Sequence, residues 1–175
     1  MKKGPRGFSL IELLIVVAII LIIAAIAIPN LLRSRIAANQ ASAVGSLRTL
    51  NTAEVTYSTT YNTGYSSTLG DLGPAAAGQN TPTASFAGLI DEVLAGMPAA
   101  GQAATSVNVS SKSGYTFNYS PATADPTGKI DFYSFTAVPV SAGTTGTNYY
   151  YTDQSGVIRQ NSTAVAGSSD SPLAG

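Results

Sequence analysis

The N-terminal part of the chain contains a run of 21 residues, 8–28, that is suited to hydrocarbon apart from Ser9 and Glu12. An α-helix rises about 1.5 Å per residue, so this run would be about 31 Å long and would match the ~30 Å hydrocarbon core of a bilayer. Three basic residues precede it: Lys2, Lys3 and Arg6. Positive charge is retained on the cytoplasmic side. We therefore expect a membrane-spanning helix whose N-terminus is cytoplasmic.

The carboxylate of Glu12 can be interpreted in two ways. Ser9 and Glu12 have the spacing of a capping box, in which the two side chains satisfy free amides at a helix start, and an acidic residue there also suits the helix dipole. An ionisable group inside a spanning segment nevertheless costs about 2.5–3.5 kcal/mol at the helix centre and less near an end. The second interpretation is that Glu12 meets a positively charged partner inside the apolar phase.

Composition excludes several classes of function. The chain has no cysteine and no histidine, which excludes disulfides, thiolate nucleophiles, Cys-based zinc sites and His-based catalytic triads. Its net charge is zero, and the part after Phe8 has no basic cluster that could neutralise many phosphates. We therefore expect no enzyme, no cofactor and no specific nucleic-acid partner.

A basic leader that ends in Gly7, followed by FSLIELLIVVAIILIIAAIAIPNLL, resembles the N-terminus of type IV pilins and pseudopilins. The matched residues are Gly7, Phe8, Glu12 and Pro29. The resemblance implies that a prepilin peptidase cuts between Gly7 and Phe8 on the cytoplasmic side and methylates the Phe8 amine. It also implies that Glu12 pairs with the Phe8 amine of an adjacent subunit, and the two charges cost less to bury together than singly.

An ordinary secretory signal is a rival interpretation. The basic start, the apolar run and the small residues Ala25 and Ala27 also fit a signal with a cleavage site before Ile28. Apolar regions of such signals are typically about 7–15 residues long, shorter than this one. A mature chain that begins at Ile28 would support the signal peptide, and one that begins at methylated Phe8 would support the pilin-like interpretation.

The helix is predicted to continue beyond the membrane. Pro29 should kink it or open it locally, because proline cannot donate a backbone hydrogen bond. A stripe at three-, four- and seven-residue spacing follows: Ile36, Ala43, Leu47, Leu50, Tyr57 and Tyr61. Gln40 and Glu54 interrupt this stripe. We expect helix from Phe8 to about Thr60, ending near the segment 62–64.

After this helix, the period of the pattern changes. Residues 86–96, FAGLIDEVLAG, predict a short helix that stops at Gly96. Alternation then predicts an antiparallel sheet of about four strands, aromatic on one face: 115–119, 130–138, 148–152 and 156–160. That aromatic face should bury the outer half of the long helix.

The expected fold class is α+β, and the resemblance implies a type IV pilin fold. The chain divides into five predicted segments: a leader over 1–7, a transmembrane or filament-core helix over 8–28, an amphipathic continuation over 29–61, a globular head over 62–160 and a disordered tail over 161–175.

Major pseudopilins often carry an acidic, Gly-rich calcium loop near their C-terminus. The aspartates that could supply such a site here are scattered along the chain: Asp125, Asp131 and Asp153, with Asp170 beyond them. Calcium sites use closely spaced oxygen ligands. We interpret these aspartates as turn residues and expect no metal.

The resemblance implies a structural subunit of a type IV pilus, with roles such as adhesion, motility or DNA uptake. Its partners would be a homo-oligomeric helical filament, the prepilin peptidase, the inner-membrane assembly platform and, indirectly, cytoplasmic ATPases. The subunit would lie in the bacterial inner membrane before assembly into an extracellular pilus. Two alternatives remain: the major pseudopilin of a type II secretion system, in a periplasmic pseudopilus, and a secreted or membrane-anchored binding module.

Overall fold

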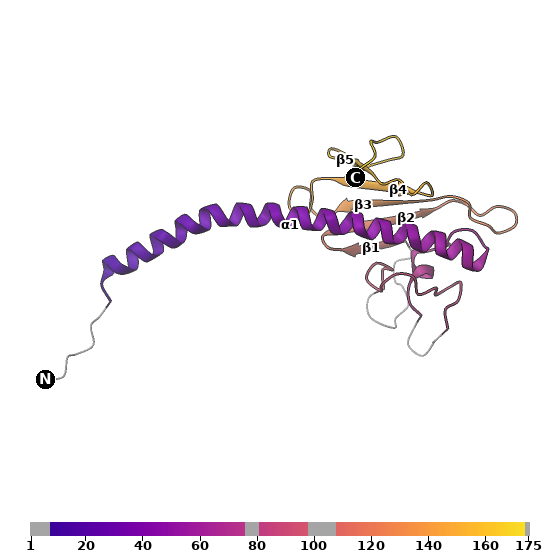
Figure 1. The fold of residues 1–175 in the computed structure, drawn as a ribbon, viewed down its shortest axis with the longest axis horizontal. Helices are drawn as coiled ribbons and strands as arrows, with labels where there is room; N and C mark the ends of the chain where they lie inside the picture. The colour runs from indigo at the N-terminus through magenta and orange to yellow at the C-terminus, as the bar shows by residue number, and fades with distance from the viewer. Residues whose placement is uncertain (1–7, 76–80, 98–107, 174–175) are drawn as a thin grey trace. The chain divides into compact units, whose positions relative to one another are not determined.

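A computed structural model describes residues 8–75, 81–97 and 108–173 (Figure 1). Within these ranges the helical elements are α1 (Leu10–Tyr61) and the 3-10 helix η1 (Leu69–Leu72). The strands are β1 (Val109–Lys112), β2 (Tyr115–Pro121), β3 (Tyr133–Pro139), β4 (Tyr149–Asp153) and β5 (Arg159–Asn161). The chain divides into two compact units, Met1–Arg35 and Ile36–Gly175, which we call the N-terminal unit and the head unit.

The helix α1 has nearly the bounds that the sequence predicts. Pro29 lies inside it and does not end it. At the C-terminal end, Asn62 adopts a left-handed φ of 55°, a conformation in which helices commonly terminate. The interpretation of Asn62 and the residues after it as the stop of the helix is therefore confirmed.

The chain that leaves α1 is attached to the segment before β3. Gly64 has a φ of 80°, and a β-carbon there would overlap the backbone of Ile130. This close approach allows the amide of Tyr65 to donate to the Ile130 carbonyl at 2.8 Å. Glycine is required at position 64 for both its backbone conformation and its lack of a side chain.

The sheet is an antiparallel meander in the order β1-β2-β3-β4-β5. The α+β class, with one long N-terminal helix and an antiparallel sheet, is confirmed. The described residues form five strands where the sequence predicted about four, because β1 also pairs with β2. A two-residue turn at Ser113 and Gly114, both at positive φ, joins these two strands, as is typical of tight hairpins.

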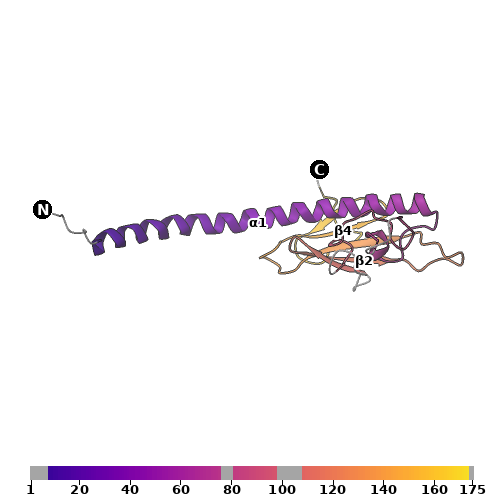
Figure 2. The ribbon, with the colours of Figure 1, turned by 90° about the horizontal axis from the view of Figure 1, so that it is seen from below.

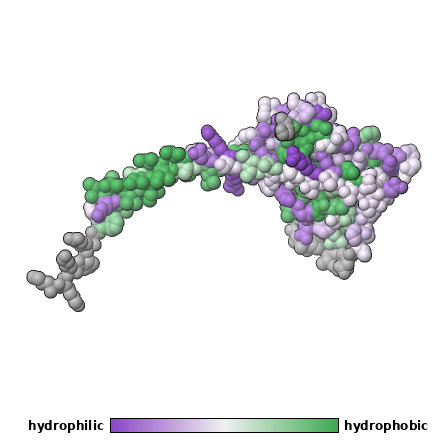
Figure 3. Space-filling model, viewed as in Figure 1, coloured by the Kyte–Doolittle hydropathy of each residue, from purple (hydrophilic) through white to green (hydrophobic). Residues whose placement is uncertain are grey.

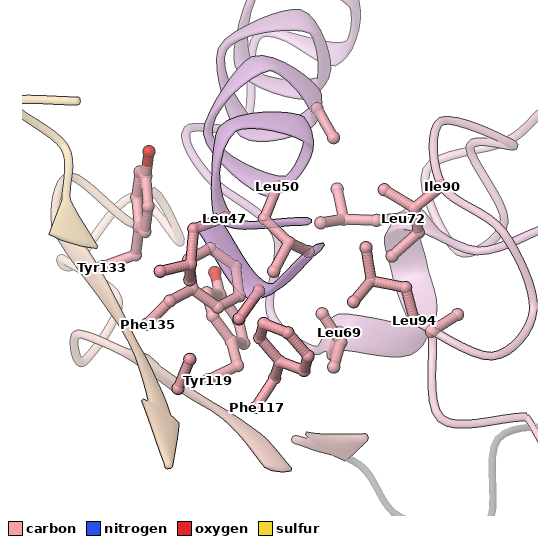
Figure 4. Close-up of a cluster of buried hydrophobic side chains, with 14 of the residues drawn as sticks. Leu47, Leu50, Leu69, Leu72, Ile90, Leu94, Phe117, Tyr119, Tyr133 and Phe135 are labelled. Carbon is pink, nitrogen blue, oxygen red and sulfur yellow. The ribbon is translucent and has the colours of Figure 1, made fainter. Parts of the chain in front are cut away.

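The sheet and α1 share the core of the head unit, as predicted. Along β2 and β3, buried side chains alternate with partly buried ones. The C-terminal part of α1 lies along this face in two perpendicular views (Figures 1 and 2). Leu47 and Leu50 of α1 are fully buried in this core (Figure 4). The sheet contributes three aromatic side chains to the same cluster: Tyr119, Tyr133 and Phe135. Burying a leucine completely contributes about 1.5–3 kcal/mol.

The segment that follows α1 covers another side of this helix. It contributes four labelled apolar side chains to the buried cluster (Figure 4): Leu69, Leu72, Ile90 and Leu94. Thr68 caps η1, because its hydroxyl accepts from the Asp71 amide at 3.2 Å while the Asp71 carboxylate accepts from the Thr68 amide at 2.9 Å. The sequence pattern did not predict this short helix.

The predicted helix over 86–96 is wrong. The structure has a single turn over residues 92–96 there, and Gly88 lies at a φ of 66°. The amides of Ala87 and Leu89 donate to the carbonyls of Asp71 and Leu72, each at 2.8 Å. These amides pair with a remote segment, so they do not enter a helical ladder.

Residues 162–173 pack beside β5, whereas their composition predicted a disordered tail over 161–175. The Gln160 amide donates to Ser171 at 3.0 Å, and the Leu173 amide donates to Ile158 at 2.8 Å. Ala166 is 3% exposed. Small polar residues are held here by hydrogen bonds to the backbone of the edge strand, a source of order that composition does not report.

Candidate functional site

The N-terminal unit presents a continuous apolar surface (Figure 3). Between Phe8 and Leu32, the large apolar side chains have exposed fractions from 46% at Val17 to 81% at Phe8. Within the described residues, α1 is the one helix long and apolar enough to cross a membrane. Monomeric soluble proteins rarely expose apolar patches larger than a few hundred Å². Lipid or other protein chains must therefore cover this surface.

The first turn of α1 contains the candidate assembly residue. The carboxylate of Glu12 accepts from the Ser9 amide at 2.9 Å, and the Ser9 hydroxyl accepts from the Ile11 amide at 3.4 Å. The Glu12 half of a capping box is thus formed, while the Ser9 hydroxyl binds the amide one residue earlier than the pattern requires. Glu12 is exposed at the surface of the helix. Capping therefore explains one contact of the carboxylate and leaves it accessible to a partner.

The structure also locates the predicted processing residues and the predicted helix kink. Gly7 lies outside the described residues, and Phe8 is 81% exposed. Pro29 continues the helix, and Ser34 in the next turn donates its hydroxyl to the Asn30 carbonyl at 3.0 Å. Cleavage after Gly7, methylation of Phe8 and a kink at Pro29 remain predictions.

The three candidate metal ligands are engaged in local hydrogen bonds and an ion pair, and Asp125 and Asp131 both contact Lys129. One oxygen of Asp125 accepts from the Thr127 hydroxyl at 2.6 Å and from the Lys129 amide at 2.9 Å, and these bonds lower the pKa of the carboxyl, the Thr127 hydroxyl most strongly. Asp131 lies 3.2 Å from the Lys129 ammonium, and Asp153 accepts from the Ser155 amide at 2.9 Å. The described residues contain no group of three or more acidic, histidine or cysteine side chains that could hold a metal.

A buried carboxylate in the head unit was not singled out by the sequence. Glu54 was interpreted as an interruption of the apolar stripe, yet it is completely buried. Its two oxygens accept from the Ser66 amide at 2.9 Å and from the Ser66 hydroxyl at 2.7 Å. Tyr119 donates its hydroxyl to the Ser66 carbonyl at 2.7 Å. The three residues connect α1, the segment after it and β2 through one buried polar network.

Burial dominates the electrostatics of this network. It raises the pKa of the Glu54 carboxyl, and the hydrogen bonds from Ser66 oppose that rise only in part. Burial and the neighbouring Glu54 also raise the pKa of the Tyr119 hydroxyl, which therefore stays protonated and able to donate. The two hydrogen bonds from Ser66 to the buried Glu54 fix the path of the chain after α1. Separating the two residues would leave buried polar groups unsatisfied, which costs free energy.

Comparison with known proteins agrees with the N-terminal features. The family model described as the prokaryotic N-terminal methylation motif matches residues 2–28. Type IV major pilin protein PilA of Myxococcus xanthus is 52% identical over 52 residues, 30% of this chain and 24% of that protein. Type IV wide pilus major component PilA4 of Thermus thermophilus is 62% identical over 37 residues, 21% of this chain and 28% of that protein.

The chain spans about a quarter of the length of the curated relatives that it matches. No solved structure is significantly similar to it. The matched motif includes the candidate residues Gly7, Phe8 and Glu12. The chain thus carries the prokaryotic N-terminal methylation motif, and over part of its length it is similar to two type IV pilins.

Proposed function

We propose that the chain is a structural, non-enzymatic subunit of a type IV pilus. Prepilin peptidase removes residues 1–7 and methylates Phe8, and the subunit then leaves the membrane and polymerises through the apolar part of α1. The head units face outward in the filament. The observation that carries this proposal is the exposed apolar surface of the N-terminal unit, which begins at a methylation motif and contains one carboxylate, Glu12.

An apolar helix with an exposed surface can be covered in turn by lipid and by copies of itself. Before assembly, hydrocarbon covers the side chains from Leu13 onward. In the filament, the same side chains pack against equivalent helices of neighbouring subunits. The two relatives are named as a major pilin and a wide pilus component, which supports a filament-forming role for a chain that shares this segment.

The carboxylate gives the assembly step its specificity. Cleavage after Gly7 creates a positively charged amine at Phe8, at the edge of the apolar surface. Glu12 lies about one helical turn away, at ~1.5 Å per residue, and is accessible in the single chain. An oppositely charged pair is less costly to bury than either charge alone. Pairing across subunits therefore favours one axial offset between neighbouring helices.

The test uses variants that separate charge from capping. Glu12→Gln keeps an oxygen that can accept from the Ser9 amide but removes the charge, and Ser9→Ala removes the Ser9 hydroxyl while keeping the charge. We expect both variants to be cleaved after Gly7 and methylated, as mass spectrometry of the N-terminal peptide would show. Sheared-cell fractions and electron microscopy should show filaments for Ser9→Ala and few or none for Glu12→Gln.

Two results would contradict the proposal. Filaments at wild-type abundance from Glu12→Gln would remove the electrostatic role of Glu12. A mature chain that begins at Ile28 would instead identify residues 1–27 as a secretory signal. Shearing wild-type cells also tests the choice of assembly, because a pilus subunit should be the main component of the sheared filaments.

A further inference from the structure

The charged residues in the described part of the N-terminal unit lie near its two ends: Glu12, Arg33 and Arg35. The residues between Glu12 and Arg33, 13–32, are all uncharged. In a helix that rises ~1.5 Å per residue, these positions span about 30 Å, the thickness of a typical hydrocarbon core. Figure 3 shows the hydrophobic surface with hydrophilic side chains at both of its ends. With Glu12 at one edge of the hydrocarbon, Arg33 therefore lies at the other.

The two arginines are available to a partner. Both side chains are exposed, and the ion pairs of the described residues join Lys112 to Asp91 and Lys129 to Asp131. No hydrogen bond between described residues involves either guanidinium of Arg33 or Arg35. Successive residues are about 100° apart around a helix, so the two arginines extend on nearly opposite sides of α1. Each can therefore bind a different ligand.

We infer that Arg33 and Arg35 bind the phosphate groups of phospholipids on the side of the membrane opposite the leader, and so set the depth of α1 before assembly. The planar guanidinium presents paired donors that match phosphate oxygens, whereas an ammonium acts as a single point of charge. Sliding α1 by one turn in either direction would draw a charged group into hydrocarbon, at a cost that rises toward the centre. The inference rests on the membrane stage of the proposed function.

Lipid phosphate fits these arginines better than an acidic protein partner does. The spacing between Glu12 and Arg33 matches the thickness of the hydrocarbon core of a bilayer, a match that an assembled filament does not require. A phosphate layer also surrounds the helix, and it can therefore serve side chains that point in nearly opposite directions. An acidic residue of a neighbouring chain would serve one of them.

Solid-state NMR of the full chain in phosphatidylcholine bilayers provides a direct test. With ¹³C-labelled arginine, ³¹P dephasing reports which guanidinium carbons lie beside lipid phosphate. We expect Arg33→Lys/Arg35→Lys to lose the dephased signal that these two residues contribute. The matched control is Arg48→Lys, an exposed arginine beyond the apolar surface, which should leave the dephased signal unchanged.

Depth is measured with single cysteines, because the natural chain has none. Spin labels at Ala27→Cys and Ala37→Cys should lie in hydrocarbon and near the surface, respectively. Arg33→Gln/Arg35→Gln should shift the label at position 37 deeper. Replacing phospholipid by phosphate-free galactolipid should produce a smaller shift in the same direction with the natural arginines, because their charge still resists entry into hydrocarbon.

The outcomes distinguish this inference from the proposed function. Absence of ³¹P dephasing at both arginines, or an unchanged depth in galactolipid, overturns the lipid assignment while leaving filament formation intact. Filament loss from Arg33→Lys/Arg35→Lys without any change in dephasing would also overturn it and would indicate an acidic protein partner. A water-accessible label at position 27 would overturn the membrane stage itself, and the inference with it.

Discussion

The buried carboxylate of Glu54 should make the stability of the head unit depend on pH. Burial raises its pKa above the ordinary value of 4.5, so the folded state holds the proton more tightly than the unfolded state does. The contribution of this proton to the free energy of unfolding is complete below pH 4.5. It is lost as the pH rises through the folded-state pKa, by about 1.4 kcal/mol for each unit of the upward shift.

Two substitutions at Glu54 should have different effects. Glu54→Ala leaves the buried Ser66 amide without an acceptor and removes the nearer acceptor of the Ser66 hydroxyl. One unsatisfied buried group costs about 1–3 kcal/mol, so we expect a loss of about 1–3 kcal/mol. Glu54→Gln can accept from the Ser66 amide and donate to its hydroxyl. That hydroxyl lies 3.2 Å from the Tyr119 hydroxyl, which can receive its proton. Glutamine should therefore be within about 1 kcal/mol of wild type at pH 5, since the number of hydrogen bonds is kept.

Urea unfolding of the full chain in detergent micelles, between pH 4.5 and pH 8, provides the assay. The chain has nine tyrosines and no tryptophan, so tyrosine fluorescence reports on the core. The wild type should lose stability across this range relative to Glu54→Gln. Asp131→Asn removes an exposed carboxylate and controls for the change in net charge. The pKa values of Asp91 and Asp125 are lowered from 3.8, so the titration of these groups changes stability at pH values below this window. Equal pH slopes for wild type and Glu54→Gln would refute the reasoning.

Two further predictions concern packing and backbone conformation, and the same urea assay measures both. Gly64→Ala should destabilise the head unit by more than about 1 kcal/mol, because the added β-carbon meets the Ile130 backbone. Gly45→Ala, in open space within α1, should stabilise it by about 0.5–1 kcal/mol. Similar effects at both positions would contradict this. Leu50→Ala should cost about 2–5 kcal/mol at a fully buried site, while Val55→Ala, 53% exposed on the same helix, should cost under about 1 kcal/mol; comparable losses would exclude the described core.

Features that depend on local periodicity were predicted well. The spacing of Leu47, Leu50 and Tyr57 indicated which face of α1 is buried, and the alternation in β2 and β3 indicated the aromatic face of the sheet. In each case the side chains that reveal the element are also the ones that pack it. The end of α1 was predictable because Asn62 and Gly64 tolerate the left-handed conformations that a helix exit requires.

Features that depend on remote backbone partners were not predicted. The strand β1 has the sequence VSSK, and it exists because its backbone pairs with β2 at a sheet edge. Residues 86–96 have an apolar pattern that suits a helix, but amides at 87 and 89 bind carbonyls of the segment around η1. The segment 162–173 is held by β5 although its composition predicts disorder.

The candidate assembly segment could be located without any coordinates, because a leader, an apolar run and a single carboxylate within it are all local features. The role of Glu54, in contrast, is evident only in the folded head unit. In the sequence, Glu54 only interrupts an apolar stripe. In the fold, the chain after α1 brings the amide and the hydroxyl of Ser66 to its carboxylate. A polar group can be buried when the fold supplies hydrogen-bond partners from elsewhere in the chain. The periodicity of the sequence does not predict those partners.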